Sequence, residues 1–386
     1  MLEEYMKNIG YNEEEQNLIL SSYPLNQTKE ADFLYAMRNL VNFFHRNGLD
    51  NESIIKITKV VPGIILKSTE NIKERIKELF SFGFNKIEVY QMIINYPYLL
   101  EMTHQRIEAK YQLFMEIGFT KEECNELFVK KTNILNKDTS TIEKRIEFFQ
   151  NYGYEKNDII IILRDIPELF DKTIQQITNK LDEYKDFGFR KEEIIPITTY
   201  LPELFIYNKE DIDQKTKYLK ENGYTTKNIT NIIKKLPIIL KHQNLEHLEE
   251  NIENLENLGF GKSEIVPLTE KNPYILLYTK EMIAENFKNF IEFDYQNAEV
   301  IKMMNQTPLL LTYNAEELRR RLQYYKEKHV LKELKENSTN LLISLEFIQK
   351  REKYIKNNKR SDLFFNDKEF EEKYHITRKQ VIEGVK

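Results

Sequence analysis

The sequence contains "PELFDKTIQQITNKLDEYKDFGF" at Pro167–Phe189 and "PELFIYNKEDIDQKTKYLKENGY" at Pro202–Tyr224. The second stretch repeats the first after 35 residues, and it keeps the Pro, the Gly and several apolar positions while most polar positions change. Fixed self-similarity at such a period is typical of a solenoid, in which each unit packs only against its neighbours. The two stretches therefore predict a repeat architecture.

Two residue types mark this period along most of the chain. Successive glycines stand 35 to 38 residues apart, and a proline follows most of them after 14 residues. Thr132 interrupts the proline series once, and Asp294 stands where the next glycine is expected. The glycines are Gly10, Gly48, Gly83, Gly118, Gly153, Gly188, Gly223 and Gly259. The prolines are Pro24, Pro62, Pro97, Pro167, Pro202, Pro237, Pro273 and Pro308.

Each unit is predicted to form a helix, a proline turn and a second helix. Asn85 and Thr120 are expected N-caps with a glutamate three residues later, which is the capping-box pattern. The proline restricts the residue before it, so the first helix should end there and an apolar turn such as PELF should follow. A second set of N-cap residue types stands six residues beyond the proline position, or seven in the repeat of Pro237. Its members are Ser68, Thr103, Asp138, Thr173, Asn208, Asn244, Thr279 and Asn314.

These patterns predict an all-α fold, an α-solenoid of about nine repeats of 35 residues that forms a curved superhelix. We expect residues 1–328 to form the repeat array as a single solenoid domain. Residues 329–386 should hold a degenerate last repeat and C-terminal capping helices.

Composition limits the classes of function. The formal net charge is −5, and the single cysteine, Cys124, excludes an internal disulfide and favours a reducing compartment. No apolar run approaches ~18 residues, so we expect no membrane span. The acidic segment Met1–Glu15 resembles neither a signal nor a transit peptide. The sequence thus favours a cytoplasmic or nucleoid-associated location, with an organelle matrix only if a targeting segment has been removed.

No constellation of residues suggests catalysis. The six histidines are scattered without a metal-ligand spacing, and there is no phosphate-binding glycine motif. We therefore expect no enzyme activity, no metal site and no cofactor. Most of the tyrosines and phenylalanines fall in apolar columns, which favours core packing over base stacking, and no stacking residue can be singled out.

The repeat unit resembles that of the mitochondrial transcription termination factor (mTERF) family. "YKDFGFRKEEIIPITTYLPELF" at Tyr184–Phe205 and "LENLGFGKSEIVPLTEKNPYIL" at Leu255–Leu276 carry the resemblance, and "LFFNDKEFEEKYHIT" at Leu363–Thr377 is similar to the way such proteins end. The resemblance covers nearly the whole chain. It implies a curved α-solenoid that binds double-stranded DNA or RNA in its groove, although this chain is more acidic than the family's usual members.

One column of the repeat, 27 residues after most of the glycines, carries cations in five consecutive units and amides in the next two. Two readings stay open: the side chains line a nucleic-acid groove, or they are solvated or paired between repeats. The column consists of Arg75, Lys110, Arg145, Lys180, Lys215, Asn251, Asn286 and Arg321.

Further cations gather at two other places. Lys130, Arg164 and Lys234 belong to a group at the end of the first helix, where cations also suit the helix dipole. Arg319–Arg321 and Gln349–Arg360 are the densest basic clusters of a C-terminal segment, 312–386, with 18 Lys and Arg against 13 Asp and Glu. Solvated faces are the alternative explanation for such clusters.

The sequence thus predicts a non-enzymatic nucleic-acid-binding protein, for duplex DNA or structured RNA, that acts in transcription or RNA metabolism. The alternative is a protein-interaction solenoid scaffold without a nucleic-acid role. A protein partner fits either reading, no membrane partner is expected, and we expect a monomer. If the column lines one continuous face, Gln at Lys110, Arg145 and Lys180 should weaken salt-dependent binding and leave melting nearly unchanged.

Overall fold

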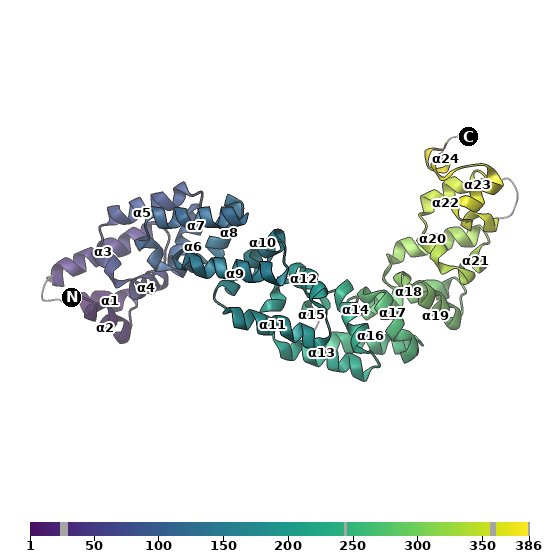
Figure 1. Ribbon diagram of the computed structural model, residues 1–386, viewed down its shortest axis with the longest axis horizontal. Helices are drawn as coiled ribbons and strands as arrows, with labels where there is room; N and C mark the ends of the chain where they lie inside the picture. Colours follow the sequence, from purple (N-terminus) through teal and green to yellow (C-terminus); the bar gives the residue numbers. More distant parts are fainter. Residues whose placement is uncertain (24–29, 243–244, 356–359, 385–386) are drawn as a thin grey trace. The chain divides into compact units, whose positions relative to one another are not determined.

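The computed structural model describes residues 1–23, 30–242, 245–355 and 360–384 (Figure 1). Throughout these residues the secondary structure consists of α-helices and short 3₁₀ helices, without a strand. The chain divides into two compact units, and each is described by itself. Unit 1 comprises Met1–Asp182 with Pro202–Phe205, and unit 2 comprises Glu183–Leu201 with Ile206–Lys386.

The repeats of unit 1 follow the predicted order of helix, 3₁₀ turn and helix. The elements are α1 (Leu2–Ile9), α2 (Glu13–Ser21), α3 (Glu30–Arg46), α4 (Asn51–Val60), η1 (Pro62–Leu66), α5 (Thr69–Ser81), α6 (Lys86–Asn95), η2 (Pro97–Glu101), α7 (His104–Ile117), α8 (Lys121–Lys130), η3 (Thr132–Asn136), α9 (Thr139–Tyr152), α10 (Lys156–Asp165), η4 (Pro167–Phe170), the first part of α11 (Ile174–Phe187) and η5 (Pro202–Phe205). Pro24 lies outside the described residues.

Unit 2 continues the same order to the C-terminus. After the end of α11 its elements are α12 (Lys191–Tyr200), α13 (Lys209–Glu221), α14 (Thr226–Lys235), α15 (Ile239–His242), α16 (Leu245–Asn257), α17 (Lys262–Lys271), η6 (Pro273–Leu276), α18 (Lys280–Glu292), α19 (Asn297–Gln306), η7 (Pro308–Thr312), α20 (Ala315–Glu327), α21 (Leu331–Glu336), η8 (Ser338–Leu342), α22 (Leu345–Glu352), η9 (Arg360–Phe364), α23 (Asp367–Tyr374) and α24 (Arg378–Glu383). The division at residue 328 stays a prediction.

The predicted caps form. The Asn85 and Thr120 side chains accept the N–H groups of Glu88 and Glu123, which complete capping boxes. In the second N-cap column every described member except Asp138 accepts a hydrogen bond from a backbone N–H of the first turn. Asn244 lies outside the described residues. Local sequence therefore fixes where most helices begin.

Two positions explain why the glycine column ends each second helix. Gly118 has φ 116°, and a Cβ there would lie 2.2 Å from Cε of Lys156, the first residue of α10. Asp294 replaces the glycine with φ 67°, a left-handed conformation that Asp tolerates better than most residues. The turn also forms at Thr132, where the proline is missing.

The turns pack on the second helices of the preceding repeats. Within the units, contacts join α3 to η1, α5 to η2, α7 to η3, α16 to η6, α18 to η7 and α20 to η8. The apolar turn residues are buried, as Ile64, Leu99, Ile134 and Leu310 show with no exposed surface. Each turn therefore fills the space next to the second helix of the repeat before it. This packing positions the column of cations.

Candidate nucleic-acid interface

Four of the predicted phosphate-binding cations are buried. Lys110, Arg145, Lys215 and Arg321 have relative exposures of 5%, 9%, 7% and 6%. The expectation that these four heads line an open face is therefore wrong. Their position at the edge of the apolar stripe faces the turn of the next repeat rather than solvent.

Three of these buried cations donate hydrogen bonds to that turn. Arg145 Nε donates to the carbonyl of Leu169 at 3.1 Å, and its Nη2 donates to the carbonyl of Lys172. Lys215 Nζ donates to the carbonyl of Leu240 at 2.7 Å. Arg321 Nη1 donates to the carbonyls of Leu341 and Ile343, the latter at 2.7 Å. In these three repeats one side chain thus ties the second helix to the end of the following turn.

The amides of the same column make the same bonds. Asn251 Nδ2 donates to the carbonyl of Leu276 at 2.9 Å, and Asn286 Nδ2 donates to those of Leu311 and Tyr313 at 3.0 and 2.8 Å. Both asparagines are buried, at 0% and 2% exposure. We call Lys110, Arg145, Lys215, Asn251, Asn286 and Arg321 the donor column, because N–H donation and not charge is what its members share.

The chemistry of the turn explains this choice of residues. Carbonyl oxygens at the C-terminal end of a short helix retain acceptor capacity and carry the negative end of its dipole. Burying them without a donor costs free energy, and burying a cation without acceptors costs more. A side chain with several N–H groups meets both requirements. Burial lowers the pKa of Lys110 and of Arg145.

The donor column extends one repeat further than the sequence indicated. Arg351, on α22, is 2% exposed, and its Nη1 donates to the carbonyls of Leu363 and Phe365. Its Nη2 pairs with Asp367 at 2.9 Å. The shorter spacing of this last repeat hid the correspondence. The two asparagines in the column were the sequence signal that donation matters more than charge.

Lys110 makes a different hydrogen bond, and two cations of the predicted column, Arg75 and Lys180, are not buried. Lys110 Nζ donates to Oγ1 of Thr139 at 3.1 Å, in the first turn of the next second helix. Arg75 pairs with Glu78 on the same helix and keeps a side-chain exposure of 20%. Lys180 is half-buried on α11.

The cations at the end of the first helices make ion pairs between repeats. Arg164 pairs with Glu123 at 3.3 Å, and Lys234 pairs with Glu193 at 2.9 Å. In both pairs the acid is the capping-box residue of the preceding repeat. The hydrogen bonds at Arg190 and the ammonium of Lys234 lower the pKa of Glu193 to about 2. Lys130, by contrast, is exposed at the end of α8.

The basic cluster at the start of the C-terminal segment is the most accessible of the predicted sites. Arg319 and Arg320 have side-chain exposures of 59% and 69%. Arg319 pairs with Glu292 at 2.6 Å, and Arg320 pairs with Glu317. Their guanidinium groups are thus at the surface of α20, whereas Arg321 between the same helix and η8 is not. Part of the other cluster, 356–359, lies outside the described residues.

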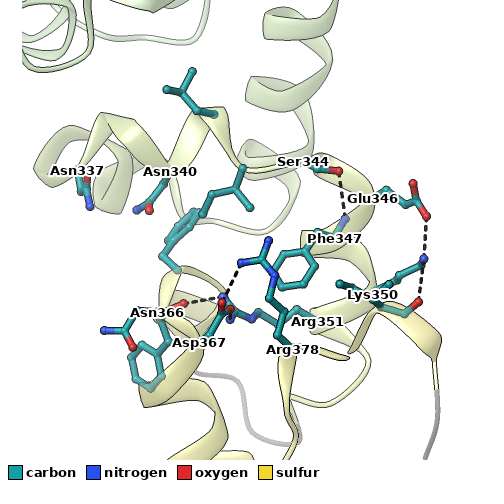
Figure 2. A pocket seen from close by; sticks show the side chains of 15 residues that line it. Asn337, Asn340, Ser344, Glu346, Phe347, Lys350, Arg351, Asn366, Asp367 and Arg378 are labelled. Atoms are coloured by element: carbon teal, nitrogen blue, oxygen red, sulfur yellow. Dashed lines mark hydrogen bonds and ion pairs between the residues drawn. The ribbon is translucent and has the colours of Figure 1, made fainter. Parts of the chain in front are cut away.

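A cavity of about 700 Å³ lies near the C-terminus of unit 2 (Figure 2). Asp367 accepts hydrogen bonds there from both Arg351 and Arg378, at 2.9 and 2.8 Å. Lys350 pairs with Glu346 at 2.8 Å. The charged groups of this cavity therefore largely neutralise one another, and it offers no clear anion site.

The described ranges hold neither a metal-binding cluster nor a helix that could span a membrane. In 1–23, 30–242, 245–355 and 360–384 no three His, Cys, Asp or Glu residues gather as a metal site would require. Nor does any helix described there combine the length and the apolar character needed to cross a bilayer. Cys124 is buried on α8, as a packing residue would be.

Comparison with known families gives one match. The sequence matches the mTERF family over residues 3–111, 98–222 and 208–371, which together span nearly the whole chain. No curated protein matches the sequence.

Proposed function

Because the chain belongs to the mTERF family, we propose that it is a non-enzymatic protein that binds duplex DNA or structured RNA in transcription or RNA metabolism. Members of this family generally bind nucleic acid in these processes. The family match over three consecutive segments is the observation that carries the proposal. The donor column adds no support, because its charges are turned into the protein.

Phosphate contacts are assigned to the cations that solvent reaches. These are Lys130, Arg319 and Arg320, with the partly exposed Arg75, Arg164, Lys180 and Lys234 as further candidates. A phosphate could reach Arg145 or Lys215 only after hydrogen bonds to buried carbonyls had broken. Those residues are therefore left out of the proposed contact surface.

A protein-interaction scaffold is the second candidate. Two observations favour it: the net charge of −5, and the burial of the cations that would otherwise form the most regular basic row. Solenoids present extended surfaces to peptides and domains as readily as to nucleic acid.

A salt titration of binding to random duplex DNA, duplex RNA and a structured RNA hairpin distinguishes the two candidates. Neutralised phosphates release counterions, so the affinity of a nucleic-acid-binding protein should fall steeply between about 50 and 200 mM salt. Absence of binding at about 50 mM salt would refute the nucleic-acid proposal. Analytical ultracentrifugation of the same sample checks the expectation of a monomer.

A further inference from the structure

The proline turns of unit 1 form a continuous edge. Lys67, which ends η1, pairs at 3.4 Å with Glu101, which ends η2. Arg106, at the start of α7, donates through Nη2 to the carbonyl of Asn136, the last residue of η3, at 3.2 Å. We call this surface, formed by residues 59–67, 94–106 and 129–138, the turn edge.

The turn edge is basic although the chain is acidic. It carries Lys59, Lys67, Arg106, Lys130, Lys131 and Lys137, against Glu101 and Asp138. Asp171, from the next turn, pairs with Lys131 and, at 2.7 Å, with Lys137. Lys59 pairs with Glu15 at 3.3 Å. The exposed Arg106 donates to a neutral carbonyl, and Lys130, on the part of the turn edge that the next repeat supplies, is also exposed. Neither charge is neutralised there by a described ion pair.

An exposed aromatic ring stands in the middle of this edge. Tyr98, the second residue of η2, is 46% exposed, whereas most aromatic residues of the repeats are buried. The half-buried ring of Tyr96 lies 5.7 Å from it, centre to centre. Tyr96 in turn bonds to the side chain of Asn136 and lies near Arg106, so it connects the Tyr98 ring with η3 and with one of the two cations.

We propose that the turn edge of unit 1 binds a single-stranded segment of RNA or DNA, with a base stacked on Tyr98 and the flanking phosphates on Arg106 and Lys130. Every base has a face that can stack on an aromatic ring, and cations beside the ring follow the backbone. A duplex offers its phosphates to such an edge but keeps its bases stacked on one another. The inference rests on the proposed function and adds a binding mode to it.

Tyr98→Ala tests the stacking contact directly. Fluorescence anisotropy would follow labelled oligouridylate and oligothymidylate of about 12 nucleotides, and a blunt duplex of the same length. Loss of one stacked base should lower single-strand affinity about tenfold and leave duplex affinity within about twofold. Tyr98→Phe keeps the ring and should bind as the parent does.

Tyr274→Ala is the matched control. Tyr274 occupies the same position in η6 and is 51% exposed. The segment of the next repeat that corresponds to 129–138, from Asn305 to Asn314, carries no charged residue. This variant should keep the parent's single-strand affinity. The proposal would be overturned if Tyr98→Ala and Tyr274→Ala lost the same single-strand affinity. It would also be overturned if Tyr98→Ala kept both the parent's single-strand affinity and its melting temperature.

The behaviour of the parent protein separates the two levels of inference. Binding to the duplex alone would overturn the single-strand site and leave the proposed function standing. Binding to neither probe at about 50 mM salt would overturn both. If the affinity for either single-stranded probe falls in Tyr98→Ala, the site is supported. The probe that the parent binds more tightly, oligouridylate or oligothymidylate, shows whether the site prefers RNA or DNA.

Discussion

The same position of the repeat is filled differently in the two units. In unit 1 long cations, Lys110 and Arg145, reach the next repeat, whereas in unit 2 the short amides Asn251 and Asn286 do so as well as Lys215 and Arg321. Arg145 and Asn286 both donate to the carbonyl five residues after the proline of the neighbouring turn, that of Lys172 and that of Tyr313. The comparison teaches that a periodic row of cations can be a hydrogen-bonding device between repeats and need not be a surface for phosphates.

The largest expected effect comes from removing the donors of unit 1. Met at both Lys110 and Arg145 keeps an unbranched side chain of similar length but removes the side-chain hydrogen bonds to Thr139, Leu169 and Lys172. Because a hydrogen bond to a charged group contributes about 1.5–3 kcal/mol, we expect the two replacements together to lower the free energy of unfolding by about 3 kcal/mol or more. Urea denaturation followed by circular dichroism measures it.

Gln at the same two positions sharpens the test, since an amide still donates. The Gln variant should lose less stability than the Met variant, but a measurable amount. This expectation is the reverse of the one drawn from the sequence, that Gln leaves melting nearly unchanged. The exposed Lys144, on α9 beside Arg145, provides the control, and Lys144→Met should stay within about 0.5 kcal/mol of the parent. If the paired Met variant is as stable as this control, the donor column does not hold the repeats together.

In unit 2, Asn286→Asp exchanges an amide for a carboxylate of nearly equal size. The carboxylate cannot donate to Leu311 and Tyr313, and it would be buried against their oxygens. We expect a loss of about 2–4 kcal/mol at neutral pH, larger than for a simple truncation. The folded-state pKa of the new carboxyl should be raised, so the loss should shrink as pH falls and the protonated acid donates. A loss that does not depend on pH would argue against donation.

The ion pair between first helices gives a smaller effect with its own pH dependence. The folded-state pKa of Glu193 is lowered to about 2, chiefly by the backbone N–H of Arg190 and then by the Arg190 and Lys234 side chains. A lowered pKa stabilises the fold above the unfolded-state value of about 4.3, and that stability is lost as pH falls towards 2. Glu193→Gln should therefore cost about 1 kcal/mol at pH 7, and the difference from the parent should vanish between pH 4.5 and 2. A constant difference across this range in thermal melts would contradict the assignment.

The smallest effect on stability belongs to the exposed pair on α20. Arg319 and Arg320 make surface ion pairs, which contribute about 0–1 kcal/mol. Gln at both positions should leave unfolding nearly unchanged. If both contact phosphates, the slope of log affinity against log salt for duplex DNA should fall by about two. An unchanged slope would remove this cluster from the proposed interface.

Local features of the fold could be predicted from the sequence because local chemistry decides them. The capping box of Thr120 and Glu123, the turn at Pro167–Phe170 and the left-handed Asp294 all follow from interactions within a few residues. The fate of the Arg145 side chain could not be predicted in this way. Its helical position lies at the edge of the apolar stripe, and only the packing of the next turn against that edge decides between burial and exposure.

The candidate surface was harder to predict for the same reason. Tyr98 follows a proline, as Glu168 and Leu309 do in other repeats, and nothing in that column singles it out. The neighbouring Tyr96 bonds to Asn136 of η3 and lies near Arg106 of α7, so the surroundings of the exposed ring depend on the three-dimensional arrangement. The family, by contrast, could be recognised from the period and the turn motif alone.

Native-state acylation of lysines tests the central claim, that the column faces the protein, most directly. Mass spectrometry would compare the labelling rates of Lys110 and Lys215 with that of the exposed Lys144. Buried donors react only after local opening, so the two should be protected at least about tenfold, the factor set by an opening free energy of ~1.4 kcal/mol. Adding nucleic acid should not change their rates. Labelling of Lys110 and Lys215 as fast as Lys144, with protection on addition of duplex, would contradict the account.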